Sequence, residues 1–269
     1  MADIWNIAIL NPMLNGLIAL SELLFKNFGL AIIVLTVIVR LVLTPLTVRQ
    51  TQSTKAMQLL QPKLQEIQKK YARDQQKMHQ EMMKLYKEAG INPLGCMWPL
   101  VIQMPIWIAL YQSILQALAA TPENLLMLSQ HLYAWDMVGH AIPLNEMFLG
   151  LRLSQPDPTL ILAVLVGITM WVQQKMVTPP PTDPQQQQMS SMTTLMMPLM
   201  FSFFTLSFPS GLALYWVVSN IIGIVIQYIV GDGWGYFTLP FMKPKGAAPA
   251  VKSLPESKAL KAGNEKKKG

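Results

Sequence analysis

Five apolar runs, each near the length that a helix needs to cross a bilayer, are the feature that most restricts the fold of this chain. A spanning helix needs about 20 apolar residues to cross the hydrocarbon core. The chain is 52% hydrophobic and only 13% charged, which is typical of a membrane protein. We therefore predict an all-α membrane protein with five transmembrane helices, at about 28–47, 94–118, 159–177, 192–208 and 211–230.

The basic residues predict how these spans are oriented. Of 21 Lys and Arg, nine fall in 49–90 and eight from Lys243 onward, whereas only Lys26 and Arg152 would lie on the opposite side. Because loops rich in Lys and Arg stay in the cytoplasm, 49–90 and the tail are expected there, and the N-terminus outside. The net charge of +7 thus reflects topology better than it indicates nucleic-acid binding.

The N-terminal region, 1–27, lacks the basic start and cleavage site of a signal peptide. Asn11 and Pro12 resemble an N-cap and a first-turn proline. The apolar run that follows, from Met13 to Phe25, is too short for a span. We expect a helix lying in the outer membrane interface, and a sixth span starting near residue 4 is the alternative.

The segments between the spans differ in character. In 49–90, apolar residues recur every three or four positions, which predicts a cytoplasmic antiparallel helical hairpin with a turn at Ala72 to Gln75. Pro62 should kink or restart its first helix. The external loop, 119–158, should pack on the membrane surface. The Pro- and Gln-rich loop from Thr178 to Gln188 should be mobile, and the basic tail, 231–269, largely disordered.

Arg40 lies inside the first predicted span, and no predicted span contains an Asp or Glu to pair with it. A cation in hydrocarbon costs about 2.5–3.5 kcal/mol on insertion scales, so such a residue is a candidate functional site. Water is the least costly way to solvate it. Arg40 is seven residues, about 10 Å, from the cytoplasmic end of its span, so a recess open to the cytoplasm would reach it.

Polar residues form stripes on the neighbouring spans. Thr36, Thr44 and Thr47 share a helical face with Arg40. The last span carries a second stripe, which consists of Trp216, Asn220, Gly223 and Gln227. The second span adds Gln103. We interpret Gln112, Ser113 and Ser219 as ordinary helix–helix hydrogen-bonding residues.

Catalytic and metal-binding signals are weak. The single cysteine, Cys96, excludes an intrachain disulfide and a metal site of several cysteines. The three histidines lie in predicted loops, and neither an H-E-x-x-H run nor an intramembrane Asp pair is present. We therefore expect no enzymatic activity, no cofactor and no metal site.

Three stretches of the sequence resemble the YidC-type insertases of the YidC/Oxa/Alb family. They are IVRLVLTPLTVRQTQSTKAMQLLQPKLQEIQKKY, EMMKLYKEAGINPLGCMWPLVIQMPIWIALY and FPSGLALYWVVSNIIGIVIQ. The resemblance runs from about 28 to 230, with all five spans in order. The sequence differs from Gram-negative members, which carry a further N-terminal anchor span and a large periplasmic domain.

The resemblance implies a five-helix core in the bacterial inner membrane, with a hydrophilic groove open to the cytoplasm and the lipid. Arg40 matches the groove arginine of the family. Thr36, Gln103, Trp216, Asn220 and Gln227 would line or border the groove. The third and fifth spans would form an apolar slide for the departing substrate helix, with Met170 and Trp171 as candidates.

The function that the resemblance implies is insertion and folding of nascent membrane proteins, alone or beside the Sec translocon and in contact with membrane lipids. Binding of ribosomes through the basic tail is a separate hypothesis. Two other functions are alternatives to membrane protein insertion. A small-anion transporter or channel could use Arg40 as its binding site, but the inverted or parallel repeats common in transporters are not visible. An intramembrane hydrolase would lack recognisable catalytic residues.

Overall fold

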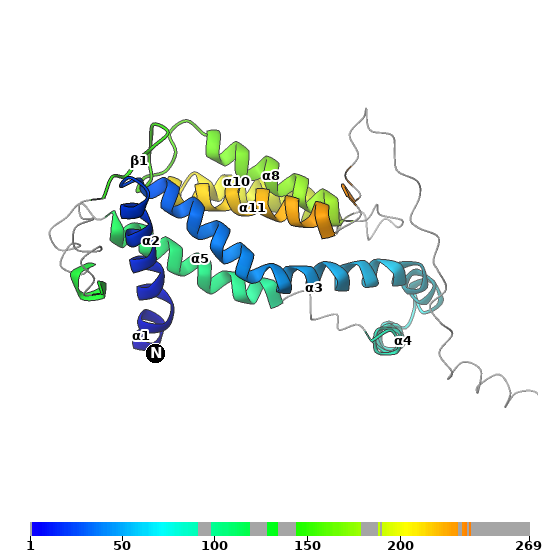
Figure 1. The fold of residues 1–269 in the computed structure, drawn as a ribbon. Coiled ribbons are helices and arrows are strands. Elements are labelled where there is room, and N and C mark those ends of the chain that lie inside the picture. Colours follow the sequence, from blue (N-terminus) through cyan, green and yellow to red (C-terminus); the bar gives the residue numbers. More distant parts are fainter. Residues whose placement is uncertain are drawn as a thin grey trace, which may run out of the picture.

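The computed structural model describes residues 2–90, 98–118, 128–133, 144–178, 188, 190–230, 233–235 and 237, and this part is mostly helical (Figure 1). Ten helical segments and one short strand pair have defined bounds. They are α1 (Ala2–Trp5), η1 (Asn6–Leu10), α2 (Asn11–Leu23), α3 (Phe28–Lys70), α4 (Gln75–Glu88), α5 (Trp98–Ala117), β1 (Met147–Phe148), β2 (Leu151–Arg152), α8 (Ile161–Val177), η3 (Met192–Met196), α10 (Met197–Thr205) and α11 (Ser210–Val230).

Helix α11 is at the centre of the bundle, because it packs against both α3 and α8. Helix α10 packs on α8, and α2 packs on α3 and α5. In Figure 1, α2 runs across the direction of the other helices at one end of the bundle. The core at this end is fully buried and consists of aliphatic side chains from several helices, among them Leu14, Leu17, Ile32, Ile114 and Leu212.

Two helical stretches of the described part are long and apolar enough to cross a membrane, Phe28–Ser53 and Ser210–Val230. They contain the first and fifth predicted spans. Two further helical stretches are apolar but shorter, Ile161–Val177 and Met192–Thr205. A count of five spans therefore remains a prediction, whereas the helical fold is observed.

Helix α3 is longer than the span predicted for it. It continues from Phe28 to Lys70 without interruption, so the first span and the first hairpin helix are one helix. The side chain of Asn27 caps its start by accepting a hydrogen bond from the N–H of Leu30 at 3.0 Å. Pro45 and Pro62 both lie inside it. Figure 1 shows α3 changing direction along its length, as expected where a proline removes a helical hydrogen bond, and the chain does not restart.

The prediction that Asn11 is an N-cap is wrong. Helical conformation begins earlier, at Ala2, and the chain passes through the π-helical turn η1 directly into α2. The same order recurs where η3 leads into α10. Pro12 and Pro198 each follow a π-helical turn at the second position of the next helix. Because proline cannot donate to the preceding turn, a wider turn before it accommodates the ring.

The N-terminal helices pack into the bundle. Asn15 of α2 is fully buried, and its amide donates to the carbonyl of His131 and accepts from the N–H of Tyr133, both at 2.8 Å. On α1, the indole of Trp5 donates to Gln112 at 2.8 Å. Whether this region lies in the membrane interface stays a prediction.

The expected external loop contains a structure that the sequence did not predict. Strands β1 and β2 pair antiparallel around a two-residue turn, Leu149 and Gly150. Leu128 and Leu153 from this loop are buried in the core. Three parts of the predictions lie outside the described residues. They are Cys96, most of the predicted mobile loop that begins at Thr178, and the tail from Lys243.

Candidate functional site

Arg40 lies on the face of α3 that packs against α11. Its Nε donates a hydrogen bond to the hydroxyl of Ser219 on α11, at 2.7 Å. Among the described residues the ion pairs all lie elsewhere, and none involves Arg40. The guanidinium has five N–H donors, and this contact uses one of them. A neutral hydroxyl therefore holds the arginine, while its positive charge has no acidic counterpart in the described part of the chain.

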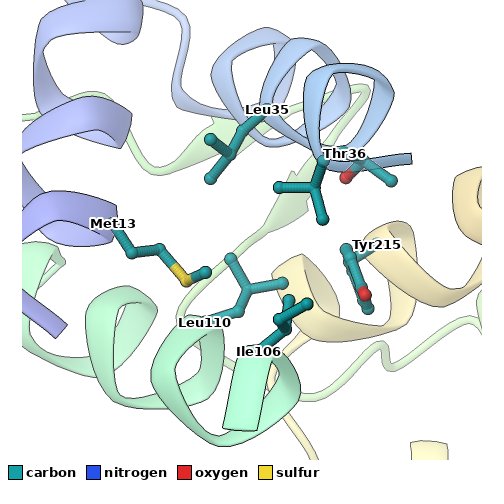
Figure 2. A pocket seen from close by; sticks show the side chains of 7 residues that line it. Met13, Leu35, Thr36, Ile106, Leu110 and Tyr215 are labelled. Atoms are coloured by element: carbon teal, nitrogen blue, oxygen red, sulfur yellow. The ribbon is translucent and has the colours of Figure 1, made fainter. Parts of the chain in front are cut away.

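Thr36, one turn before Arg40, is buried and not at an open surface. Its hydroxyl donates to the carbonyl of Ile32 at 2.6 Å within the same helix. Figure 2 shows it beside a small pocket lined by side chains from α2, α3, α5 and α11; the lining residues are Met13, Leu35, Thr36, Val39, Ile106, Leu110 and Tyr215. Its volume of about 10 Å³ is enough for one water at most.

Gln103 on α5 reaches towards α11. Its side-chain amide donates a hydrogen bond to the hydroxyl of Tyr215. Tyr215 is one helical turn before Ser219, so the two face the same side of α11. The structure thus brings Gln103, Tyr215, Ser219 and Arg40 to adjoining turns of three helices.

Trp216 lies in a helix interface, and its place beside a groove stays a prediction. Its ring is 9% exposed and packs among other aromatic rings. The centroids of Trp107 and Phe201 lie 5.2 and 5.6 Å away, and that of Phe208 lies 5.9 Å away. Such tilted and edge-on pairs stabilise helix packing, so the observed role of Trp216 is in the α5–α10–α11 interface.

Gln227 and Asn220 face different neighbours. The side chain of Gln227 accepts a hydrogen bond from Thr51 of α3 at 3.2 Å. Asn220 turns the other way and donates to Thr169 of α8 at 3.1 Å. Three residues later, Gly223 leaves room for the side-chain amide of Gln173, which occupies the space that a Cβ would fill. With Trp216 between α5 and α10, the predicted stripe on α11 is therefore divided among three helix interfaces.

The two candidate slide residues lie near the middle of α8. Both Met170 and Trp171 are half-buried. The ring of Trp171 makes an edge-on contact with Phe237, with centroids 5.7 Å apart. No contact in the described part assigns either of them a role in substrate movement.

Ser219 and Tyr215 are the site residues that the sequence reasoning missed. The sequence predicts a helix–helix hydrogen bond for Ser219, which it makes, but does not indicate that its partner is Arg40, and it does not single out Tyr215. Each precedes a selected residue by one position, which is a rotation of about 100° on a helix. Their four-residue spacing was the available signal. The interpretation of Gln112 is supported by its bond to Trp5, whereas the Ser113 hydroxyl is buried with no hydrogen-bond partner in the described part.

The described residues contain no group of three or more His, Cys, Asp and Glu side chains that could hold a metal ion. The polar groups around Arg40 are hydroxyls and amides. Such a set can bind and orient a polar or anionic group, and it contains no paired nucleophile and base of the kind that covalent catalysis uses.

Comparisons with known proteins agree with the arrangement of the helices. Residues 20–234 match the family model described as 60Kd inner membrane protein. The chain is 38% identical over 231 residues to membrane protein insertase YidC 2 of Bacillus anthracis, covering 84% of this chain and 81% of that protein. It is 41% identical over 209 residues to membrane protein insertase YidC of Haemophilus influenzae, covering 77% of this chain but only 34% of that one.

A solved structure is also similar. It is described as an active YidC insertase crystal structure with the first transmembrane domain resolved. The match has a TM-score of 0.53 and 28% identity, and it covers 76% of this chain and 42% of the other. The similarity thus extends over most of the chain and over less than half of that structure.

Proposed function

Because the chain belongs to the family of 60Kd inner membrane proteins, in which its relatives are the YidC membrane protein insertases, we propose that it moves newly made membrane proteins into the bilayer with Arg40 as the receiving charge. The observation that carries this proposal is the hydrogen bond between Arg40 and Ser219. It holds a cation in the middle of a candidate span without neutralising it.

The proposed mechanism is non-covalent. A nascent apolar segment first meets the cytoplasmic hairpin formed by the end of α3 and α4. The polar or acidic flank of the segment then enters a wet groove beside Arg40. With Nε held by Ser219, the terminal nitrogens of the guanidinium are left to form a paired contact with a carboxylate. Water in the groove lowers the cost of removing the flank from the cytoplasm.

Release of the apolar segment is proposed to follow α8 and α11, the third and fifth predicted spans. Its driving force is transfer of apolar surface from water to lipid. The membrane potential acts in addition on the charges of the flank. The proposed steps use no catalytic group, so the activity we propose is transport and not an enzymatic reaction.

The proposed partners follow from this activity. Nascent membrane proteins are the substrates, and the Sec translocon and the lipids surround the site of release. The eight basic residues from Lys243 onward are a proposed ribosome-binding tail. The proposed orientation places the N-terminus outside and the C-terminus in the cytoplasm of a bacterial inner membrane.

Replacement of Arg40 tests the central step. In cells depleted of their own insertase, we expect Arg40→Ala to lower insertion of a substrate with an acidic flank about tenfold or more, equal to about 1.4 kcal/mol. Arg40→Lys keeps the positive charge but cannot form the paired contact, so its activity should lie between those of Arg40→Ala and the parent. The measurement is protease protection of the translocated flank, and a matched substrate with a neutral flank is the control.

Equal insertion of the acidic-flank substrate by Arg40→Ala and the parent would refute the proposed role of the charge. A small-anion transporter would instead give solute flux in proteoliposomes that depends on Arg40. The insertase proposal expects no such flux.

A further inference from the structure

Residues with a left-handed backbone point to a second contact surface. Four non-glycine residues of the described part have positive φ: Phe25 at 59°, Lys26 at 57°, Leu149 at 50° and Leu160 at 62°. Side chains with a Cβ rarely adopt this conformation, and Gly or Asn is usual there. Yet three of the four are large apolar residues. Phe25 is 93% exposed, Leu149 86% and Leu160 54%.

The turn between β1 and β2 shows most clearly why these residues are unusual. Leu149 and Gly150 both have positive φ, as in the two-residue hairpin turn for which Asn-Gly is the favoured sequence. Leucine at the first position adds backbone strain and exposes apolar surface to water. The strain and the exposure thus both destabilise the turn at Leu149. Transfer of the leucine side chain into an apolar environment would offset this cost.

Phe25 and Leu149 lie at the same end of the bundle. Phe25 is three residues before the start of α3. The β-hairpin is docked on the first turn of that helix, because the Phe148 ring fills the space that a Cβ on Gly29 would occupy. A bridge between Asn27 and Asn145 joins the same two segments.

Leu160 also lies at this end. It directly precedes α8, and the loop before it is fastened to the start of α11. The N–H of Ser210 donates to the carbonyl of Gln155 at 2.7 Å, and that of Gly211 donates to Leu153 at 3.0 Å. The three exposed residues therefore surround the starts of α3, α8 and α11.

Charges next to these residues decide what kind of surface they fit. Lys26 forms an ion pair with Glu22, with a nitrogen-to-oxygen distance of 4.0 Å. Arg152 forms one with Glu146, at 3.8 Å. Each base thus has a nearby carboxylate, so the surface has little net charge with which to select anionic headgroups. Its apolar side chains match the boundary between headgroups and acyl chains.

We propose that Phe25, Leu149 and Leu160 insert into the leaflet at this end of the helices and anchor the depth of the bundle in the bilayer. These three residues are the interfacial anchors. Their position has a consequence for the site. Arg40 is twelve residues after Phe28, about 18 Å along the helix, which is past the middle of a hydrocarbon core about 30 Å thick. Anchoring the start of α3 therefore sets how far Arg40 lies from either surface.

Spin labels measure this depth. In a Cys96→Ser background, which removes the native cysteine, single cysteines replace Phe25, Leu149 and Leu160 and carry a nitroxide in lipid nanodiscs. We expect all three labels to be more accessible to oxygen than to a water-soluble nickel chelate. A label at Ile168, 54% exposed on α8, is the lipid reference, and one at Gln76 on α4 is the water reference. Accessibility like that of Gln76 at Phe25 and Leu149 would overturn the proposal.

A second experiment keeps the label away from the anchors. The label is placed at Leu41, 65% exposed on α3, and the anchors are changed to Phe25→Asn with Leu149→Asn. Asparagine tolerates positive φ, so the turns are retained. The proposal expects the depth of the Leu41 label to shift, whereas Met83→Asn on α4 should not move it. An unchanged depth in the double variant would count against anchoring.

Changing the fraction of anionic lipid separates the two ways of binding a membrane. The interfacial anchors should keep the same depth, because the bases beside them have acidic neighbours. Depth that increases with anionic lipid would show binding by headgroup charge and would contradict the proposed apolar insertion. None of these measurements depends on insertase activity, so they stand independently of the proposed function.

Discussion

The two interfaces that α11 makes with its neighbours differ in the kind of polar contact they contain. Between α3 and α11, Arg40 donates to Ser219, and farther along Thr51 donates to Gln227. Between α8 and α11, the contact of Asn220 with Thr169 involves neutral groups only. One interface thus contains a charge, and the other contains none.

This difference separates two tasks that the proposed mechanism needs. A guanidinium held at Nε by a neutral hydroxyl keeps its terminal nitrogens for an ionised acceptor, to which hydrogen bonds are shorter and about twice as strong. The polar contact between α8 and α11 is neutral, so we expect this interface not to respond to a charged flank. Variants in the first interface should therefore alter how substrate charge affects insertion, whereas variants in the second should alter stability alone.

The largest effect among the remaining variants is expected from Ser219→Ala. It removes the acceptor that holds Arg40 and leaves the charge in place. A hydrogen bond to a charged group contributes about 1.5–3 kcal/mol. At the lower end of that range, insertion of an acidic-flank substrate should fall about tenfold. The measurement is the ratio of the insertion rates of an acidic-flank and a neutral-flank substrate in the same preparation.

Ser113→Ala is the matched control for this prediction. Ser113 is also a buried serine of a helix in the bundle, and its hydroxyl has no hydrogen-bond partner in the described part of the chain. Its removal should leave the ratio between the two substrates unchanged. Ser219→Thr keeps the hydroxyl, so it should insert the acidic-flank substrate as the parent does. That result would support a role of this hydroxyl in positioning Arg40. A proportional loss for both substrates in Ser219→Ala would indicate a structural effect alone.

A smaller effect, on stability and its pH dependence, is expected at the start of α8. Asp157 is 5% exposed and accepts hydrogen bonds from the N–H of Leu162 at 2.8 Å and from the N–H and hydroxyl of Thr159 at 2.7 and 2.6 Å. Burial alone would raise the pKa of this carboxyl. The hydrogen bonds outweigh burial, and the pKa of Asp157 is lower than its ordinary value.

The lowered pKa fixes the sign of the pH dependence. A carboxyl with a lower pKa in the folded state contributes its full stabilisation above the ordinary value, about 3.9, and loses it as the pH falls towards the folded value. Asp157→Asn replaces hydrogen bonds to a charged acceptor by weaker bonds to a neutral one, so it should reduce stability by about 1 kcal/mol at neutral pH. Thermal unfolding should show this difference narrowing below about pH 4. A difference that widens on acidification would contradict the assignment.

The sequence predicted the helices better than it predicted which faces of them meet. The helical runs followed from hydrophobicity, and the lack of an Asp or Glu in the predicted spans identified Arg40 as the candidate site residue. On α11, however, apolar residues occur nearly all round the helix, so polarity selected Trp216 and Asn220, while the face that meets α3 and α5 carries Tyr215 and Ser219.

The other features that the sequence did not predict depend on backbone geometry or on contacts between distant segments. The π-helical turns and the docking of the β-hairpin on Gly29 arise from local backbone adjustment and tertiary packing. Neither produces a periodic signal in hydrophobicity. The exposed left-handed residues Phe25 and Leu149 also cannot be identified from the sequence, since the first looks like an ordinary apolar residue next to a span and the second like one in a loop.

The smallest effect is expected in the neutral interface, from Thr169→Val. Valine nearly matches the shape of threonine but cannot accept the hydrogen bond from Asn220. Hydrogen bonds between membrane helices contribute about 0.6 kcal/mol on average, so unfolding in lipid or mild detergent should show a loss of about that size. The ratio of acidic-flank to neutral-flank insertion should stay at the parent value. A change in that ratio comparable to that of Ser219→Ala would mean that α8 also responds to substrate charge, and the distinction between the two interfaces of α11 would not hold.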